Sequence, residues 1–559
     1  MTRARVQRAS WAAAVAMMVS VALAACVGIP SGSDVMAGEL VTEDESFPFA
    51  ALPSGPQQDS TQQEILTDFM QAATSPEGSY EIARQFLTPS AAESWKPNES
   101  VLIREGGGGM SSTDPETVEY SVSTQASVNS LGVYKEDRDQ ATQRLVYTFA
   151  QVDGQWRING LADGTVISRD NFEAAFDPHA LYFFDPSYRF LIPDVRWFPA
   201  RSNVPNRIVL ALLEGQASWL QQGATLTAFP QGTQLSAAVA VTSGLATVDL
   251  SDEVTEMNNL DKARMQQQLE SSLGTVSVNT VLVTVRNVPL TIPDPGASTA
   301  TLTPPIESDP LVRSGDRFGF ATADTFSSVS GISSKVIEVD ATAATLARGQ
   351  TSAAVLGNGG AYLITSTDPP LLVDARPNLI APSIDTWKYV WSVPSTSAAP
   401  LYATGPDSVV HEVVSTLPAD ASVVSMDVSR DGARVVLYLT TDAGPRLMVA
   451  SVLRRDGVPT GLGELVDLPV QSDLPIDASW VDDRSVATLA MTEGHEVVNV
   501  FELGGPAENL GRADGGVELV GGNGTEQLRV LTAENSILQR RASGWQSTGL
   551  TADFLATQQ

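Results

Sequence analysis

The chain has 559 residues, of which 43% are hydrophobic, and its 34 basic and 65 acidic residues give a formal net charge of −31. This length exceeds what one hydrophobic core organises, so three or four domains are expected, and the hydrophobic content is that of a globular rather than a disordered protein. The negative charge excludes nucleic acid and anionic lipid head groups as general surface partners.

The N-terminal segment has the pattern of an export signal. Three arginines lie within the first eight residues, residues 11–22 are largely apolar, and Leu23-Ala24-Ala25-Cys26 follows. The apolar stretch is shorter than the about 20 residues that a membrane-spanning helix needs. A run of small residues ending in cysteine resembles the lipobox of bacterial lipoprotein signal peptides. An ordinary secretory signal that happens to end near a cysteine is the alternative.

The lipobox resemblance implies that the chain is cut before Cys26, which then carries S-diacylglycerol and N-palmitoyl groups. Loss of residues 1–25 removes three arginines and changes the formal net charge to −34. Because Cys26 is the only cysteine, no thiol would remain for a disulfide, a zinc site or a nucleophile. We therefore expect a protein held at the extracytoplasmic face of the cell membrane by its lipid.

Residues 26–58 are rich in Gly, Ser, Pro, Asp and Glu, which predicts a flexible tether with a reach on the order of 30 Å. Residues 59–186 are predicted to form an α+β domain. Thr61 can cap a first helix, a second is expected over residues 80–87 with Thr88-Pro89 as its end, and residues 106–109, all glycine, are predicted to be a loop. Strands are expected over residues 120–128, 145–152 and 156–161, with a hairpin turn at Asp153-Gly154. Helices followed by a curved antiparallel sheet resemble the NTF2-like fold.

Residues 187–292 read as an α/β domain. Helices are predicted over residues 205–214 and 260–273, and strands over 226–229, 235–241, 246–250, 276–285 and 288–292. Several motifs occur here in the order typical of the GerMN domain, which this segment resembles: Leu212–Gly215, Trp219-Leu220, Phe229–Thr233, Val248–Ser251 and the glutamine-rich stretch Gln266–Leu269.

Residues 293–314 form a linker rich in Pro, Thr and Ser, and residues 315–559 show short alternating strands without helical periodicity. Units of strand, turn and strand recur at roughly 40–50 residues, which predicts a β-propeller of about five or six blades. The clearest units lie around Asp431-Gly432, Asp482-Asp483 and the run Gly521–Gly524. A β-sandwich with additional strands is the competing interpretation.

The order of lipobox, NTF2-like domain, GerMN domain and propeller resembles the LpqB family of actinobacterial lipoproteins over the whole mature chain. The resemblance implies an accessory protein of the MtrAB two-component system. It would act on the extracytoplasmic sensor region of the histidine kinase MtrB and influence cell-wall and division homeostasis. These are expectations from the family, whereas composition indicates only an exported, acidic, multidomain protein.

Candidate catalytic and metal-binding residues are sparse. The three histidines, His179, His411 and His495, lie in different regions without metal-binding spacing. Asp431 and Asp482 are expected to close turns rather than to bind ligands, and Trp387 and Trp391 are the better candidates for an exposed propeller surface. We therefore predict no enzyme activity, no cofactor and no metal. A binding module for a glycan, lipid or small molecule of the cell envelope stays an alternative, and a cell-wall hydrolase is a third hypothesis.

Overall fold

The computed structural model describes residues 54–559 except 76–79, 137–141, 201, 294–298, 304, 397–398 and 543. The predicted signal peptide, Cys26 and most of the predicted tether therefore lie outside the described residues. In the part of the chain that is described, no helix combines the length and the apolar character that crossing a bilayer requires.

The first domain begins with three helices, α2 (Gln62–Ala72), α3 (Glu81–Arg84) and α4 (Pro89–Ser94). The predicted cap of α2 is confirmed: the Thr61 side chain accepts a hydrogen bond from the Glu64 backbone, and the Glu64 carboxylate accepts one from the Thr61 backbone. The prediction that a helix over residues 80–87 is ended by Thr88-Pro89 is wrong in its end, because α3 ends at Arg84 and Thr88-Pro89 begins another helix. Thr88 caps α4 through the Ala91 N–H and Pro89 occupies its first turn, where a missing N–H costs nothing.

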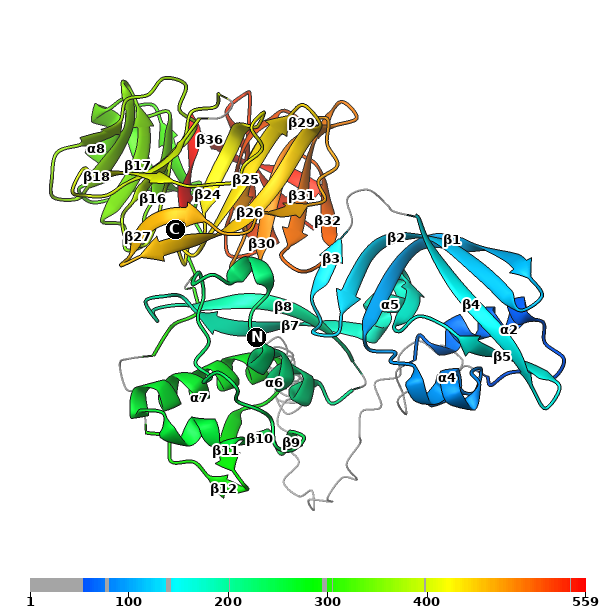
Figure 1. Ribbon diagram of the computed structural model, residues 1–559. Coiled ribbons are helices and arrows are strands. Elements are labelled where there is room, and N and C mark those ends of the chain that lie inside the picture. The colour runs from blue at the N-terminus through cyan, green and yellow to red at the C-terminus, as the bar shows by residue number, and fades with distance from the viewer. Residues whose placement is uncertain are drawn as a thin grey trace, which may run out of the picture. The chain divides into compact units, whose positions relative to one another are not determined.

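The helices precede an antiparallel sheet with strand order β5-β4-β2-β1-β6, in which β6 alone pairs in parallel and β3 pairs with β2 (Figure 1). The strands are β1 (Ser100–Asp114), β2 (Thr117–Asn129), β3 (Tyr134–Glu136), β4 (Thr142–Val152), β5 (Gln155–Gly160) and β6 (Thr165–Ser168), followed by helix α5 (Arg169–Ala175). Asp153 and Gly154 both have positive φ, so the predicted hairpin turn between β4 and β5 is confirmed. Helices followed by a mostly antiparallel sheet are thus observed, whereas the NTF2-like assignment stays a prediction.

The glycine run at residues 106–109 is not a loop, contrary to prediction, because it lies inside β1. The register against β2 shifts between Glu105 and Gly109, which marks a bulge. A Cβ at Gly108 would lie 2.1 Å from a ring carbon of the buried Tyr120. Here glycine permits the close approach of a strand to an aromatic ring.

Strands β7 (Phe176–Phe184) and β8 (Leu191–Pro199) form a hairpin. Every residue of β8 is buried. The predicted domain boundary between residues 186 and 187 falls in the turn of this hairpin. The two strands therefore connect the first and second domains rather than belonging to one of them.

The second domain has three layers, with α6 and α7 between the β7–β8 hairpin and a sheet of order β12-β11-β10-β9 (Figure 1). Its core joins apolar side chains of all three layers, among them Phe183, Leu212, Met265, Val248 and Val283. The elements are α6 (Val204–Glu214), η2 (Ser218–Leu220), β9 (Ala240–Thr242), β10 (Leu245–Leu250), η3 (Asp252–Glu256), α7 (Asn259–Leu273), η4 (Gly274–Val276), β11 (Thr280–Val285) and β12 (Val288–Pro289). Both predicted helices are confirmed.

Two predicted strands of this domain are largely wrong. Residues 226–229 form a single bridge, between Phe184 and Leu226, and residues 235–241 contribute a bridge between Leu235 and Leu250 before the short β9. Side chains take over part of the backbone bonding, since the Ala228 N–H donates to Gln268 and the Val239 N–H to Asn206. In these two segments, therefore, alternation of apolar residues indicates burial but not continuous pairing in a β-sheet.

The C-terminal region is a six-bladed propeller. Four separate sheets form blades 3 to 6, and an eight-stranded sheet divides at the parallel pair β37–β16 into blades 1 and 2. The six innermost strands, β37, β16, β20, β24, β29 and β33, contact one another in that order around a ring. Strand β37 pairs with β13, so the C-terminal strand completes the blade that the first strands of the propeller begin. The β-sandwich alternative is excluded.

The blades contain the following strands. Blade 1 has β13 (Leu311–Ser314), β14 (Arg317–Ala321), β15 (Phe326–Ser328) and β37 (Phe554–Gln558), and blade 2 has β16 (Ala343–Leu346), β17 (Ser352–Gly357), β18 (Gly360–Thr365) and β19 (Leu371–Asp374). Blade 3 has β20 (Ser383–Ile384), β21 (Val390–Ser392), β22 (Leu401–Thr404) and β23 (Val410–Val413). Blade 4 has β24 (Ser422–Val428), β25 (Arg434–Thr441), β26 (Gly444–Arg455), β27 (Val458–Leu462) and β28 (Val466–Leu468). Blade 5 has β29 (Leu474–Trp480), β30 (Ser485–Thr492), β31 (His495–Glu502) and β32 (Ala507–Arg512), and blade 6 has β33 (Gly516–Val520), β34 (Arg529–Thr532), β35 (Ser536–Arg541) and β36 (Gly544–Thr551).

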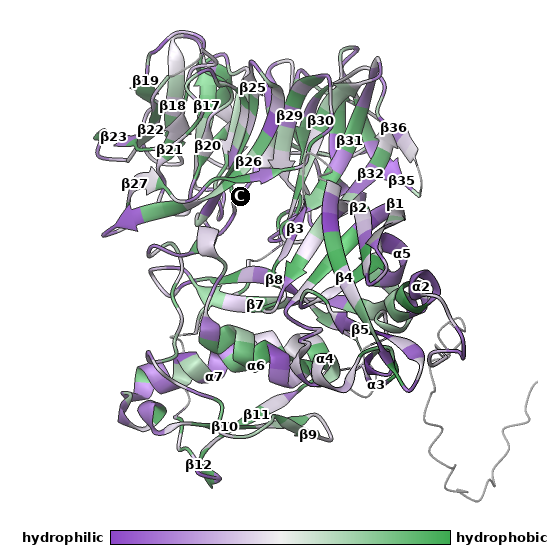
Figure 2. Cartoon of the chain, turned by 45° about the vertical axis from the view of Figure 1, so that its right-hand side comes forward, coloured by the Kyte–Doolittle hydropathy of each residue, from purple (hydrophilic) through white to green (hydrophobic). Residues whose placement is uncertain are grey.

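Two details differ from the sequence-based prediction. A short helix, α8 (Ser333–Glu338), follows blade 1, and helix η6 (Thr525–Gln527) precedes β34. Strand β13 lies within residues 293–314, so the chain enters the propeller earlier than the predicted linker allows. Figure 2 shows hydrophobic residues spread along the propeller strands, in keeping with blades that pack face to face.

Candidate functional site

The inner ring of the propeller contains three carboxylates that link successive blades. Each accepts a hydrogen bond from a backbone N–H of the next inner strand: Asp427 of β24 from Trp480 at 3.2 Å, Asp477 of β29 from Leu519 at 2.8 Å, and Glu518 of β33 from Leu555 at 2.8 Å. The same device therefore repeats at the junctions of blades 4 and 5, 5 and 6, and 6 and 1.

Burial dominates the titration of these groups. Removal from water raises the pKa of Asp427 to about 6, although hydrogen bonds and the charge of Arg430 favour the ionised form. Burial likewise raises the pKa of Asp477 to about 6 and that of Glu518 to about 7, and the charge of Asp477 raises the latter further. Raised carboxyl pKa values are also a mark of catalytic acids, but these oxygens are already bonded to groups that hold the ring together.

The C-terminal residue completes this network. The Gln559 side-chain amide donates to Asp427 at 3.0 Å and to the Val428 carbonyl at 2.8 Å. The Ser383 hydroxyl of blade 3 donates to the same Asp427 oxygen at 3.1 Å, and it accepts from the Val428 N–H at 3.1 Å. The end of β37 is thus fixed against blades 3 and 4.

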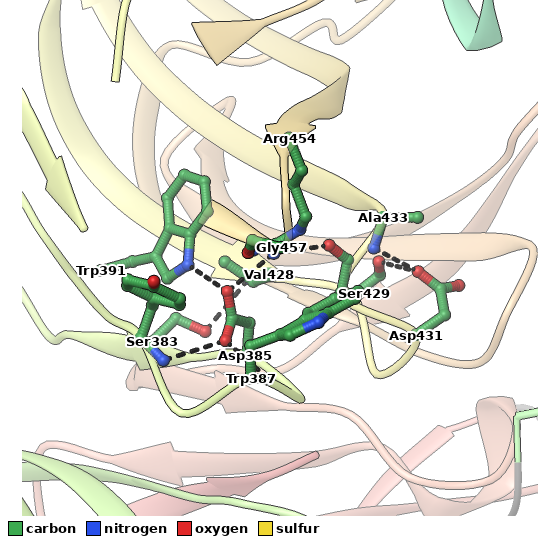
Figure 3. A network of polar contacts seen from close by, with 12 residues as sticks. Ser383, Asp385, Trp387, Trp391, Val428, Ser429, Asp431, Ala433, Arg454 and Gly457 are labelled. Atoms are coloured by element: carbon green, nitrogen blue, oxygen red, sulfur yellow. Dashed lines mark hydrogen bonds and ion pairs between the residues drawn. The ribbon is translucent and has the colours of Figure 1, made fainter. Parts of the chain in front are cut away.

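A second buried network lies where blade 3 meets blade 4 (Figure 3). Asp385 accepts hydrogen bonds from the Trp391 indole at 3.0 Å and from Arg454 at 2.7 Å, and its other oxygen accepts from the Trp387 N–H at 2.9 Å. Arg454 also donates to the Gly432 carbonyl at 2.9 Å. An ion pair buried with this many partners fixes the geometry of the junction.

The predicted roles of the turn aspartates are confirmed. Asp431 accepts from the Ala433 N–H at 2.8 Å and pairs with the buried Arg434, and Asp482 accepts from the backbone N–H groups of Arg484 and Ser485. Gly432 has φ +73°, and a Cβ there would lie 2.7 Å from the Trp387 ring. The Asp-Gly pair is therefore turn and packing chemistry.

The two tryptophans that were the better candidates for an exposed propeller surface lie in different environments. Trp391 is fully buried and is therefore not part of such a surface. Trp387 is half-buried, with the Arg454 guanidinium 4.0 Å from its ring centroid. Both residues donate to Asp385, Trp391 through its indole and Trp387 through its backbone N–H, and only the Trp391 ring is fully buried.

The structure does not bring the three histidines together. His179 lies buried in β7 beside Phe198, and burial lowers its pKa. His411 packs edge-on against Tyr389 in blade 3, whereas the partly exposed His495 lies 3.6 Å from Asp514 in blade 5. Among the described residues, no group of three His, Cys, Asp or Glu side chains could hold a metal ion.

Strand β8 is the point at which the three folded regions meet. Arg196, which is 1% exposed, forms a two-pronged ion pair with Asp194 at 3.0 and 2.6 Å. Its remaining N–H groups donate to the Leu131 carbonyl of the first domain at 3.1 Å and to the Gly215 carbonyl at the end of α6 at 3.2 Å. Asp194 also accepts from the Ala217 N–H at 2.7 Å. One buried pair thus joins the first domain, the hairpin and the second domain.

Two tryptophans extend this junction to the propeller. The Trp197 indole of β8 donates to the Gly504 carbonyl of blade 5 at 2.7 Å. The Ser451 hydroxyl of blade 4 donates to the Trp219 carbonyl of the second domain, also at 2.7 Å. Both contacts join residues more than 200 positions apart, so a single sequence carries no signal for them.

Two solved structures that resemble parts of the chain illustrate the similarity. The tandem GerMN domains of the sporulation protein GerM from Bacillus subtilis are 16% identical, covering 22% of this chain and 46% of that chain with a TM-score of 0.17. A putative TolB from Agrobacterium tumefaciens is 15% identical, covering 33% of this chain and 66% of that one with a TM-score of 0.24.

Curated relatives include lipoproteins named LpqB from several bacteria. That of Thermobifida fusca is 30% identical, but the match spans only 42% of this chain and 39% of the relative. The similarity to LpqB of Bifidobacterium longum, at 26% identity, covers 82% of each chain, and that to LpqB of Streptomyces coelicolor, at 23%, covers 94% of each.

Three family models match consecutive parts of the chain. The model of the LpqB N-terminal domain matches residues 55–173, a model described as "sporulation and spore germination" matches residues 180–291, and the model of the LpqB β-propeller domain matches residues 311–553. These assignments follow the order in which the folded regions occur and confirm the GerMN and propeller predictions. The chain belongs to the LpqB lipoprotein family.

Proposed function

We propose that the protein is a lipid-anchored accessory protein of a two-component sensor kinase, which it regulates by binding at the extracytoplasmic face of the membrane. The observation that carries the proposal is the junction at β8. There one ion pair and two tryptophan contacts join the first domain, the GerMN domain and the propeller. Such a junction would present several surfaces in a fixed relation, which suits recognition of a large partner.

The anchor rests on the sequence and on family membership. Cys26 follows a charged segment and a short apolar segment, and the relatives are named lipoproteins. Two acyl chains give stable attachment where one alone is marginal. The tether that follows Cys26 would let the folded regions reach a partner that stands above the bilayer.

A role in binding rather than catalysis is supported by how the polar residues are used. The buried carboxylates of the propeller ring bond to backbone groups of neighbouring blades. The three histidines lie apart. The kinase as partner comes from the family resemblance, and the charge of the mature chain predicts that a basic surface on that partner would strengthen the association.

The test is co-purification with the sensor region of the kinase. A chain expressed from residue 26 onward with Cys26→Ala is mixed in solution with the isolated sensor region, and the sensor region of an unrelated kinase serves as control. We expect a complex with the first sensor region only, weakening as salt is raised. Repeated failure of the native, lipidated protein to retain the kinase in membranes would contradict the proposal.

Lipid attachment is tested separately by mass spectrometry of the N-terminal peptide. The wild-type chain should carry the diacylglyceryl group on Cys26, and Cys26→Ala should stay uncleaved and unlipidated. A lipidated protein that never retains the kinase would keep the anchor and remove the partner.

A further inference from the structure

Three arginines line one cavity of about 430 Å³ beside the turn of the β7–β8 hairpin. Arg189 lies in that turn, Arg264 lies on α7, and Arg348 lies between β16 and β17. The cavity is further lined by Ser187, Tyr188, Phe190, Thr299 and Thr301. Among the described residues, this lining contains no carboxylate, although acidic residues outnumber basic ones by 65 to 34 in the chain.

The charges of these arginines are incompletely neutralised. Arg189 and Arg348 are exposed and form no ion pair with any described residue. Arg264 pairs with Asp261 at 3.0 Å through one terminal nitrogen, but its Nε is buried without a partner. The acidic residue of the hairpin turn, Asp185, accepts hydrogen bonds from backbone N–H groups instead. Three like charges at one cavity repel one another unless an anion joins them.

Aromatic rings hold the guanidinium groups in place. Arg264 stacks 3.5 Å from the centroid of Tyr188, and Arg189 and Arg348 each lie 5.4 Å from that of the buried Phe190. A guanidinium over a ring face gains cation–π attraction while its N–H edge stays available. The aromatic rings therefore orient the guanidinium groups without accepting hydrogen bonds from their N–H edges.

The wall of the cavity is fixed by backbone contacts. The Thr301 N–H donates to the Arg189 carbonyl at 2.9 Å, and the Leu191 N–H donates to the Thr301 carbonyl at 3.0 Å. Gln267 of α7 bonds both the carbonyl and the N–H of Ala300, at 2.6 and 3.1 Å. A site whose walls are already in place loses little entropy when a ligand binds.

We propose that this cavity binds the phosphate group of a small organophosphate. Arginine forks match the oxygens of a phosphate in pairs, and the Thr299 hydroxyl supplies a neutral donor for the rest of the ligand. The Ser187 hydroxyl already donates to Asp185, and the Thr301 hydroxyl donates to the Arg189 carbonyl at 3.5 Å. The volume lies in the range of small-molecule sites and exceeds what a bare phosphate fills. This site is separate from kinase binding, so it stands whether or not the proposed function does.

The experiment titrates the mature Cys26→Ala chain with inorganic phosphate and with glycerol 3-phosphate by calorimetry, at constant ionic strength set with chloride. The test variant is Arg189→Gln with Arg348→Gln, and the matched control is Arg512→Gln, an exposed arginine at the end of β32 that does not line the cavity. We expect saturable binding, tighter for glycerol 3-phosphate, that the double variant weakens at least about tenfold and the control leaves unchanged. Arg348→Lys should fall between them, because it keeps the charge but loses the fork.

A second arm identifies the source of the phosphate. The same chains are floated with phosphatidylglycerol vesicles and with phosphatidylcholine vesicles. Retention on phosphatidylglycerol that the double variant abolishes, without binding of glycerol 3-phosphate, would assign the site to a lipid head group. If neither probe binds the wild type, or if the double variant binds as well as the control, the proposal is overturned. Unchanged thermal unfolding of the double variant shows that the fold is kept.

Discussion

The GerMN domain and the propeller fasten distant segments with side chains of different chemistry. In the GerMN domain three consecutive glutamines of α7 each bond the backbone of another segment: Gln266 the Val281 carbonyl, Gln267 both groups of Ala300, and Gln268 the Ala228 N–H. In the propeller, Asp427, Asp477 and Glu518 do the same work between blades. One set is neutral at every pH and the other is not.

Because of this difference, we expect the propeller to be more sensitive to pH than the GerMN domain. Burying an amide costs only its hydrogen bonds with water, whereas burying a carboxyl also disfavours its ionised form. The propeller therefore couples its stability to protonation, and the GerMN domain does not do so through its glutamines. Substitutions in both domains distinguish the two kinds of contact.

Removing Asp427 should cause the largest loss. Its carboxylate accepts from Trp480, Ser479, Ser383 and Gln559, so Asp427→Ala leaves several buried donors unsatisfied. We expect the free energy of unfolding of the propeller to fall by about 4 kcal/mol. Denaturant unfolding followed by tryptophan fluorescence measures this loss.

Asp427→Asn is the matched control, because it keeps the shape and one acceptor oxygen without a charge. Its cost should be less than half that of the alanine variant at pH 7, where the wild type carries a buried charge. Equal costs for the two variants would mean that the retained shape and acceptor oxygen contribute nothing and that the loss comes from the carboxylate charge alone.

The second prediction concerns pH. Folding raises the pKa of Asp427 and Asp477 to about 6 and that of Glu518 to about 7, so the folded state binds protons that the unfolded chain releases near pH 4. The stabilisation from these protons is complete below about pH 4 and is lost as pH rises through 6 to 7. Asp427 should contribute on the order of 3 kcal/mol, and Asp477 and Glu518, whose side chains are less completely buried, should contribute less.

Hydrogen exchange measures this effect locally. After correction for intrinsic rates, amides of β24, β29 and β33 should be more protected at pH 5 than at pH 8, while those of β10 and β11 change little. Asp427→Asn should flatten the profile of β24. Protection that rises with pH in the inner strands would reverse the sign and contradict the argument.

The third prediction transfers the propeller's chemistry to the GerMN domain. Gln268 is fully buried, and its carbonyl accepts from the Ala228 N–H at 2.8 Å. Gln268→Glu keeps that acceptor but introduces a buried carboxyl, so the domain should lose about 2 kcal/mol at pH 8 and recover most of it at pH 5. Thermal unfolding at both pH values provides the comparison; a loss that does not depend on pH would show that the site is hydrated.

Local signals in the sequence were sufficient for many elements. The capping box of Thr61 and Glu64 identifies α2, Gly215 ends α6, and the Asp153-Gly154 turn fixes one hairpin. Each of these depends on residues at most a few positions apart. The propeller was predicted for the same reason, since strand and turn signals repeat along the chain.

The remaining features depend on contacts that a single sequence does not contain. Gly106–Gly109 has the composition of a loop, but the ring of Tyr120 from the next strand places it in β1. Nothing in the sequence around Asp427 distinguishes it from other aspartates in strands, because its partners Trp480 and Gln559 are distant along the chain. The arginine cavity likewise combines residues from three segments. Neither this cavity nor the set of carboxylates that links the inner propeller strands was predicted.

The smallest effect is expected at Gln266, and it sharpens the contrast within α7. Its amide donates to the Val281 carbonyl at 2.7 Å, but the side chain is only half-buried, so water can replace it. Gln266→Ala should therefore cost about 1 kcal/mol, independent of pH, whereas Gln268→Ala should cost about 2 kcal/mol because the Ala228 N–H is left without a partner. Thermal unfolding of the two variants at pH 5 and 8 separates these cases. If Gln266→Ala were the more damaging, the burial of a glutamine would not predict the strength of its backbone contact. The three neutral glutamines could then no longer be treated as one kind of contact.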